Sequence, residues 1–252
     1  MFGDFAAVDT VVLPDTEYVV AQDIAKKFDY TTTEVHRIVP EMIVSPSKTP
    51  RIYYFEDVVF RDKRQMKYSQ LPIYTKELMQ SMELEGQCAL VIDGTGVGEA
   101  VYDLYDDAGL DPLKIIFGSG NSPSVQTDRA GFASTSKFGK VSGIVVPKAD
   151  LVGALQVYVQ QGRLRQVAGL PFAEESRRQF QNFVGKINEK DKYIKYGNLD
   201  DEIHDDMVVT SAMACWFTQH MKKMLSVRPA SPKLQRQTYN INPFKEDEKA
   251  WR

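Results

Sequence analysis

The spacing of apolar and polar residues changes along the chain. Residues 17–23, 30–39 and 51–60 are short runs rich in valine, threonine, tyrosine and phenylalanine, and a proline-bounded segment at 41–50 is expected to be a loop. Runs of this length and composition, separated by brief turns, are typical of antiparallel strands. The first part of the chain therefore predicts a three-stranded antiparallel meander.

After this meander, strands and helices alternate. Apolar residues have helical spacing over 73–84 and 99–110, and short apolar runs at 88–92 and 112–117 are typical of strands buried on both faces. Strand–helix–strand alternation favours parallel pairing, because the helix carries the chain back across the sheet. We therefore expect parallel strands beside the meander.

The second half predicts mainly helices. It begins with a long loop at 118–140, rich in glycine, serine and threonine. The expected elements that follow are a strand at 141–146, a helix from Pro147 to residue 161, a brief strand at 163–167, a helix at 171–186, a polar segment at 188–200 and a buried, almost uniformly apolar helix at 204–225. We expect one α/β domain over residues 16–225, preceded by a lead-in at 1–15 and followed by a poorly ordered tail at 226–252.

Composition narrows the class of protein. The chain has 252 residues, 43% hydrophobic and 26% charged, with a net charge of −3, which argues against a protein that merely coats nucleic acid but not against a DNA enzyme. Cys88 and Cys215 lie in apolar runs without zinc-ligand spacing, which favours buried, reduced thiols. No apolar run reaches the roughly 18 residues of a membrane span, and no signal-peptide pattern is present. The expectation is a soluble intracellular protein without a membrane partner.

Acids stand at three places where an element ends or begins. Asp23 closes the first strand, Asp93 closes the central apolar strand, and Asp205 and Asp206 open the long apolar helix. Converging carboxylates repel one another unless a cation lies between them, and hard divalent ions prefer such oxygen ligands. Two ions about 3.5–4 Å apart can activate the attacking water and stabilise the leaving oxygen of a phosphodiester. The pattern predicts a two-metal site.

Each acid also has a purely structural interpretation. Asp23 can form a turn, Asp93 can cap the next helix, and Asp205 and Asp206 can interact with a helix dipole. Taken singly, the positions favour these interpretations. The glycines at 94, 96 and 98 do not fit the GxGxxG pattern, and no ATP-binding P-loop motif occurs, so the glycines indicate a tight turn that lets the helix pack on the sheet.

The ordered set of motifs resembles the nuclease domain of tailed-bacteriophage large terminase subunits over about residues 17–217. The segment from Tyr18 to Thr32 resembles the family's first motif, an aspartate closing a strand before an Asp-Tyr-Thr element. Leu90-Val-Ile-Asp-Gly-Thr-Gly-Val-Gly98 resembles the second motif. Val146-Pro-Lys148 is similar to the start of the following helix, and residues 197–214, with Ile203-His-Asp-Asp-Met207, resemble the third motif.

This resemblance implies an RNase H-like fold, a mixed sheet of three antiparallel strands followed by parallel strands and flanked by helices. It also implies a metal-dependent endonuclease, using two Mg²⁺ or Mn²⁺ ions, that cuts concatemeric double-stranded viral DNA during genome packaging in the cytoplasm of the infected bacterial host. By position, Asp23, Asp93 and Asp206 are the expected catalytic metal ligands, with Asp205 as a further ligand or outer partner.

The implied partners are double-stranded DNA, the packaging ATPase, the portal protein and the small terminase subunit. A complete large terminase begins with an ATPase domain, which this sequence lacks, so we expect either an isolated nuclease domain or activities divided between two chains. Because the site is acidic, phosphate contacts must come from basic residues elsewhere. The candidates are Lys137, Lys140, Lys148, Arg163 and Arg165.

Two other interpretations stay open. A Holliday-junction resolvase or transposase-like nuclease of the same superfamily would keep the fold and the acids but act on another DNA substrate. A non-catalytic docking module for the packaging motor would need neither metal nor cleavage. Preference for four-way junctions favours the first, and absence of metal binding in a folded chain favours the second.

Overall fold

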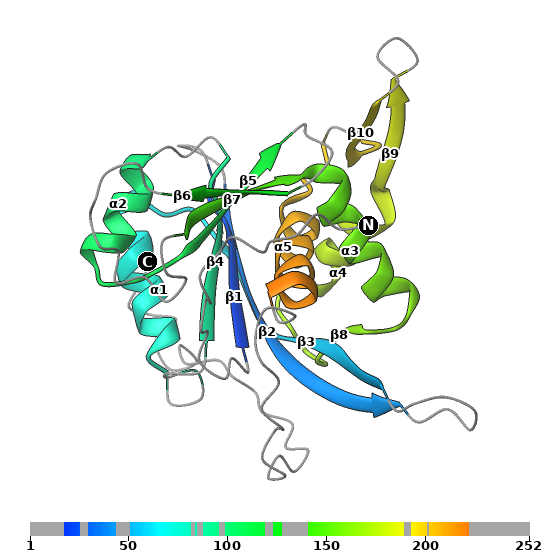
Figure 1. The fold of residues 1–252 in the computed structure, drawn as a ribbon, viewed down its shortest axis with the longest axis horizontal. Coiled ribbons are helices and arrows are strands. Elements are labelled where there is room, and N and C mark those ends of the chain that lie inside the picture. Colours follow the sequence, from blue (N-terminus) through cyan, green and yellow to red (C-terminus); the bar gives the residue numbers. More distant parts are fainter. Residues whose placement is uncertain are drawn as a thin grey trace.

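An eight-stranded mixed sheet forms the centre of the computed structural model (Figure 1). The structure describes residues 18–25, 30–43, 51–81, 84, 88–95, 99–118, 123–127, 141–188, 193–200 and 202–221. The strand order is β6-β7-β5-β4-β1-β2-β3-β8. The strands are β1 (Tyr18–Asp23), β2 (Thr31–Ile43), β3 (Arg51–Arg64), β4 (Cys88–Asp93), β5 (Leu113–Gly118), β6 (Ser124–Thr127), β7 (Val141–Pro147) and β8 (Leu164–Gln166).

The predicted meander is confirmed. Strand β1 pairs with β2, and β2 with β3, both antiparallel. Strands β2 and β3 are longer than expected, because residues 41–43 of the predicted loop continue β2 and residues 61–64 continue β3. Residues 44–50, the remainder of that loop, lie outside the described residues.

The parallel half of the sheet is also confirmed. Strand β4 pairs parallel with β1, β5 with β4, and β7 with β5. The prediction of one loop over 118–140 was wrong in part, because β6 lies within it and pairs antiparallel with β7. The carboxyl ends of β1, β4, β5 and β7 therefore point to one edge of the sheet, which we call the carboxyl edge.

Helices cover both faces of the sheet (Figure 1). A short 3-10 turn (Tyr68–Gln70) leads into α1 (Leu71–Met79), which lies with α2 (Glu99–Asp107) on one face. Helices α3 (Lys148–Gln160), α4 (Ala173–Asn182) and α5 (Asp206–Met221) lie on the other. Strand alternation explains both layers: Val19 and Ala21 of β1 pack into the α5 side, whereas Val20 packs into the α1–α2 side.

Three predicted helices end clearly earlier in the structure. Helix α1 ends at Met79 rather than 84. Helix α2 ends at Asp107 rather than 110, because Gly109 has a φ of +73° and turns the chain away. Helix α4 ends at Asn182 rather than 186, because residue 183 begins β9 (Phe183–Asn188), which pairs with β10 (Tyr193–Asn198). The hairpin was not predicted, because its first strand falls within the predicted helix and its second within the predicted polar segment.

Several predictions lie outside the described residues: the lead-in at 1–15, the tail at 226–252 and the last residues of the helix predicted to end at 225. Both cysteines are buried free thiols, as expected. Among the described residues, no helix has both the length and the apolar character required to cross a membrane.

Gly94 is required by the side chain packed beneath it. A Cβ atom at this position would lie 2.2 Å from Cγ of Lys114 and 2.7 Å from its Cδ. Lys114 has little room to move, because it is buried and its ammonium group lies 4.7 Å from the centre of the Tyr102 ring on α2. The first glycine after Asp93 therefore lets the chain pass close to Lys114 of β5. Residues 96–98, which complete the predicted tight turn, lie outside the described residues.

We predict that Gly94→Ala lowers the free energy of unfolding by about 1–3 kcal/mol, because the new methyl group overpacks the turn. Gly153→Ala is the control, since apart from the neighbouring residues and backbone of its own helix no described atom lies within 4 Å of a Cβ at that position. This control should raise stability by up to about 1 kcal/mol through helix propensity. Urea unfolding of both variants measures the difference, and equal stability for Gly94→Ala and wild type would contradict the packing argument.

Candidate active site

Asp23 and Asp93 lie side by side at the carboxyl edge. Gln22 of β1 is paired with Ile92 of β4, so the next residue on each strand is an aspartate. Adjacent strands are separated by roughly 5 Å, which places the two acids within reach of a shared cation. Asp93 is only 8% exposed. The predicted convergence of these two positions therefore follows directly from the register of β1 and β4.

Both aspartates face the α5 side of the sheet. By strand alternation, Asp23 shares a face with Ala21, and Asp93 shares a face with Val91, and these apolar residues pack in the core beneath α5. The backbone N–H of Thr95 donates to Oδ1 of Asp93 at 2.6 Å. This hydrogen bond orients the Asp93 carboxylate at the start of the glycine-rich turn.

Helix α5 brings the other two acids to the same edge. Lys63, near the end of β3, lies 3.4 Å from Oδ2 of Asp206, and Lys148, the first residue of α3 after β7, lies 3.6 Å from Oδ2 of Asp205. Asp206 is the more enclosed acid, with its side chain 15% exposed against 33% for Asp205. The positive end of the helix dipole favours carboxylates at this position.

Lys63 belongs to the same row of the sheet as Asp23. Lys63 is paired with Thr32 on β2, and Thr32 is paired with Asp23 on β1, so all three project to one face. The Lys63 ammonium also lies 2.5 Å from Oε1 of Glu175 on α4. Burial alone would lower the pKa of Lys63, but Glu175 and Asp206 outweigh this effect and hold the pKa above its usual value.

The donor set suits a hard divalent cation. Four aspartate positions lie at the carboxyl edge. The buried hydroxyl of Thr32, in the row of Asp23, has no hydrogen-bond partner among the described residues. Mg²⁺ and Mn²⁺ prefer such oxygen ligands. Within the described parts of the chain, however, no three acidic, histidine or cysteine side chains are close enough together to hold a metal ion. The acids of α5 instead contact lysines.

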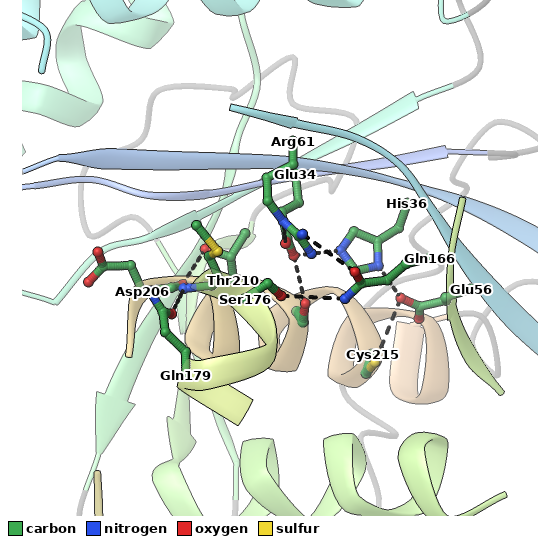
Figure 2. A network of polar contacts seen from close by, with 12 residues as sticks. Glu34, His36, Glu56, Arg61, Gln166, Ser176, Gln179, Asp206, Thr210 and Cys215 are labelled. Atoms are coloured by element: carbon green, nitrogen blue, oxygen red, sulfur yellow. Dashed lines mark hydrogen bonds and ion pairs between the residues drawn. The ribbon is translucent and has the colours of Figure 1, made fainter. Parts of the chain in front are cut away.

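A buried polar network lies further along α5, between that helix and strands β2 and β3 (Figure 2). His36 contacts two carboxylates, with Nδ1 at 2.8 Å from Glu56 and Nε2 at 3.1 Å from Glu34. Nε of Arg61 donates to Glu34 at 2.6 Å. All four side chains are fully buried. Because ionised carboxylates only accept hydrogen bonds, both nitrogens of His36 must donate, which requires a charged imidazolium.

The pKa values of Glu34 and His36 are shifted in opposite directions. Burial alone would raise the pKa of Glu34, but the charge of Arg61 and hydrogen bonds from His36 and Ser211 lower it to about 2. Burial alone would lower the pKa of His36, but hydrogen bonds to Glu34 and Glu56, together with their charges, raise it to about 9. Two carboxylates and two cations therefore neutralise one another inside the protein.

The same network holds α5 against the sheet. The hydroxyl of Ser211 donates to Glu34 at 2.6 Å, and the thiol of Cys215 lies 3.7 Å from Glu56. At the first turn, the N–H of Met207 donates to Oε1 of Gln179 on α4 at 2.9 Å. These contacts set the position of α5 along the sheet and hence the position of Asp206.

The predicted DNA-binding residues fall into three groups. Lys148 lies at the carboxyl edge beside Asp205, whereas Lys137 and Lys140 lie outside the described residues. Arg163 donates twice to the carbonyl of Tyr54, at 2.8 and 2.6 Å. Nε of Arg165 donates to Asp57 at 2.6 Å.

These arginines also lie far from the acids. Asp57, the neighbour of Arg165 in the sheet, precedes Lys63 by six residues on β3, which is about 20 Å of strand. The contacts of Arg163 and Arg165 show what the two arginines do within the protein. Their role in DNA binding stays a prediction.

Sequence reasoning missed Lys63, Glu175 and the buried network. One signal was present: Thr32, Glu34 and His36 are polar residues at alternate positions of one strand, so their side chains share a face of a sheet that was expected to be flanked by helices. Polar residues at alternate positions of a covered strand indicate paired buried groups. Their partners on α4 and α5 could not be identified, because these are more than a hundred residues away in the sequence.

A protein of known structure has a similar fold. No family model matches the chain, and no curated protein matches it in sequence. The crystal structure of the large terminase nuclease from thermophilic phage G20c matches with a TM-score of 0.50 and 17% sequence identity. The match covers 87% of this chain and 99% of that chain. The chain has an RNase H-like fold. The fold expected from the motif resemblance is thereby confirmed.

The buried network predicts that stability depends on pH in both directions. His36 has a raised pKa, so its contribution is complete below about pH 6.5 and is lost as the pH rises through about 9. Glu34 has a lowered pKa, so its contribution is complete above about pH 4.5 and is lost as the pH falls through about 2. Urea midpoints measured from pH 3 to 10 should therefore fall at both ends.

His36→Gln should lower stability at neutral pH and flatten the alkaline decline, because no imidazolium remains to lose its proton. The control is His204→Gln, which changes an exposed histidine before α5 and should retain the decline. An unchanged alkaline decline in His36→Gln would contradict the assignment of the buried charge to His36.

Proposed function

We propose that this chain is a divalent-metal-dependent endonuclease that hydrolyses phosphodiester bonds of double-stranded DNA. The observation that carries the proposal is the pairing of Asp23 and Asp93 at the ends of adjacent parallel strands, with Asp206 of α5 held at the same edge. The fold supports it, because the similar structure from phage G20c is described as a large terminase nuclease. Motif order and fold thus point to the same class of enzyme.

Asp23, Asp93 and Asp206 are proposed as direct ligands for two Mg²⁺ or Mn²⁺ ions. Asp205, more exposed and paired with Lys148, is proposed as a further ligand or outer partner. When bound, the ions would activate water and stabilise the charge that develops on the phosphate and the leaving oxygen. The protein's own contribution is to hold these acids on rigid elements, because misplaced ligands lower metal affinity.

The chain's basic and polar groups complete the proposed site. Lys148 stands beside the acids, where its ammonium can contact a phosphate of bound DNA and hold the backbone at the edge. The Thr95 N–H keeps one oxygen of Asp93 engaged, which restricts the orientation of this carboxylate. Lys137 and Lys140 are proposed as further phosphate contacts on sequence grounds. This set of contacts favours binding without strong base readout.

The more specific role proposed is cleavage of concatemeric viral DNA during genome packaging, in the cytoplasm of an infected bacterium. The motif resemblance supports this role, and it implies a packaging ATPase domain or chain, a portal protein and a small terminase subunit as partners. A Holliday-junction resolvase or transposase-like nuclease would share the fold, and cleavage of four-way junctions in preference to linear duplex would favour that alternative. A folded chain that binds no divalent ion would favour the non-catalytic docking module.

We predict that wild-type protein nicks supercoiled plasmid when Mn²⁺ or Mg²⁺ is added and that Asp93→Asn abolishes nicking. Losing a direct ligand should reduce the rate by more than the roughly 10–100-fold typical of losing an outer partner. Gel analysis of nicked and linear products over time gives the rates.

The matched control is Asp103→Asn, which removes an exposed carboxylate from α2 on the opposite face of the sheet. This variant should cleave at the wild-type rate. Undiminished cleavage by a folded Asp93→Asn protein would overturn the assignment of the site.

Lys148→Gln should weaken binding of duplex DNA, because one phosphate contact is lost. The slope of log affinity against log salt should become shallower by about 0.9. Fluorescence anisotropy over a salt series measures both quantities. Lys76→Gln is the control, since Lys76 donates to the carbonyl of Ala108 on the α1–α2 side. An identical salt slope for Lys148→Gln and wild type would remove Lys148 from the DNA surface.

A further inference from the structure

The ammonium group of Lys63 lies between acids from two different helices. It is 2.5 Å from Oε1 of Glu175 on α4 and 3.4 Å from Oδ2 of Asp206 on α5. The Lys63 side chain is only 8% exposed, so water screens these contacts poorly. Lys63 therefore has two acceptors, a short contact with a residue outside the acidic site and a looser contact within it.

Lys63 also shares a row of the sheet with one of the strand acids. Its row in the sheet continues through Thr32 to Asp23, two strand spacings or roughly 10 Å away. The positive charge of Lys63, 3.4 Å from Oδ2 of Asp206, stabilises this carboxylate in the absence of metal. The same charge repels a divalent ion that approaches Asp206.

We propose that Lys63 is a resident counter-cation that competes with a divalent ion for Asp206, and that Glu175 is the alternative partner that retains Lys63 when the ion binds. The inference rests on the proposed metal-dependent function and adds a means of control to it. Metal affinity at Asp206 is then set by an exchange between two cations and not by the aspartates alone.

The geometry suits such an exchange. The contact with Asp206 is the longer of the two, so it can be given up while the short contact with Glu175 persists. The hydrogen bond from Met207 to Gln179 holds the first turn of α5 on α4, so only side chains need to move. Glu175 is 43% exposed and can follow Lys63 without disturbing the core.

Two substitutions should change metal affinity in opposite directions. Lys63→Met removes the competing charge and should tighten Mn²⁺ binding by about tenfold or more, the range in which outer partners of metal ligands act. Glu175→Gln leaves Lys63 with Asp206 as its charged partner, and should weaken Mn²⁺ binding by a similar factor. A lysine with a purely structural role would not produce this opposition, because both substitutions would then leave the affinity unchanged or lower it.

The experiment is calorimetric titration of the metal-free full chain with Mn²⁺, with circular dichroism to confirm folding. Lys76→Met, on the far side of the sheet, is the control and should bind as wild type does. If folded Lys63→Met binds Mn²⁺ no more tightly than wild type, the inference is wrong. If Lys63→Met does not fold, Glu175→Gln decides, and unchanged or tighter binding overturns the inference. If neither wild type nor any variant binds Mn²⁺, the proposed metal-dependent function itself fails.

Discussion

Charges buried beneath α5 must neutralise one another, and the position of the candidate site depends on how they do so. Glu34, His36, Glu56 and Arg61 are all excluded from water, and removing one partner would leave an uncompensated charge in the interior. Desolvation offsets much of the attraction in a buried ion pair. We therefore infer that the network fixes the position of α5 along the sheet more than it adds to net stability. Helix α5 is otherwise apolar around most of its surface, and apolar packing alone tolerates small shifts of such a helix. Hydrogen bonds from Ser211 and Cys215 identify the turns that face the network.

The position of α5 along the sheet determines where Asp205 and Asp206 lie. Strands β1 and β4 place Asp23 and Asp93 through their own backbone pairing, whereas Asp205 and Asp206 depend on where α5 begins relative to the sheet. The two pairs consequently differ in environment. Asp23 and Asp93 lie at the ends of two adjacent parallel strands. Asp206 contacts Lys63 of β3, and Asp205 contacts Lys148 of α3. A cation that joins the two pairs must therefore compete with charges already present, which makes the lysines part of the site's electrostatics.

Much of the fold could be predicted from local pattern. Period-two runs indicated the meander, and buried apolar runs alternating with helical spacing indicated parallel strands. Since parallel strands share one carboxyl edge, acids closing β1 and β4 could be expected to meet. The strands that were not predicted lie where tertiary pairing overrode a local signal. Strand β6 lies in a segment whose glycine, serine and threonine content is typical of a loop, and it pairs with β7. Strand β9 was predicted as the end of α4, because its hydrogen bonds come only from its partner strand β10.

By itself, the sequence determined the periodicity of the elements, the glycine after Asp93 and the order of the acidic motifs, because these are properties of neighbouring residues. Only the tertiary structure decided which charges would be partners. Lys63 and Glu175 are 112 residues apart, and Glu34 and Ser211 are 177 apart. Electrostatic pairing depends on distance in space and on exclusion of water. Both are properties of packed helices and strands, and no local pattern of residues contains them.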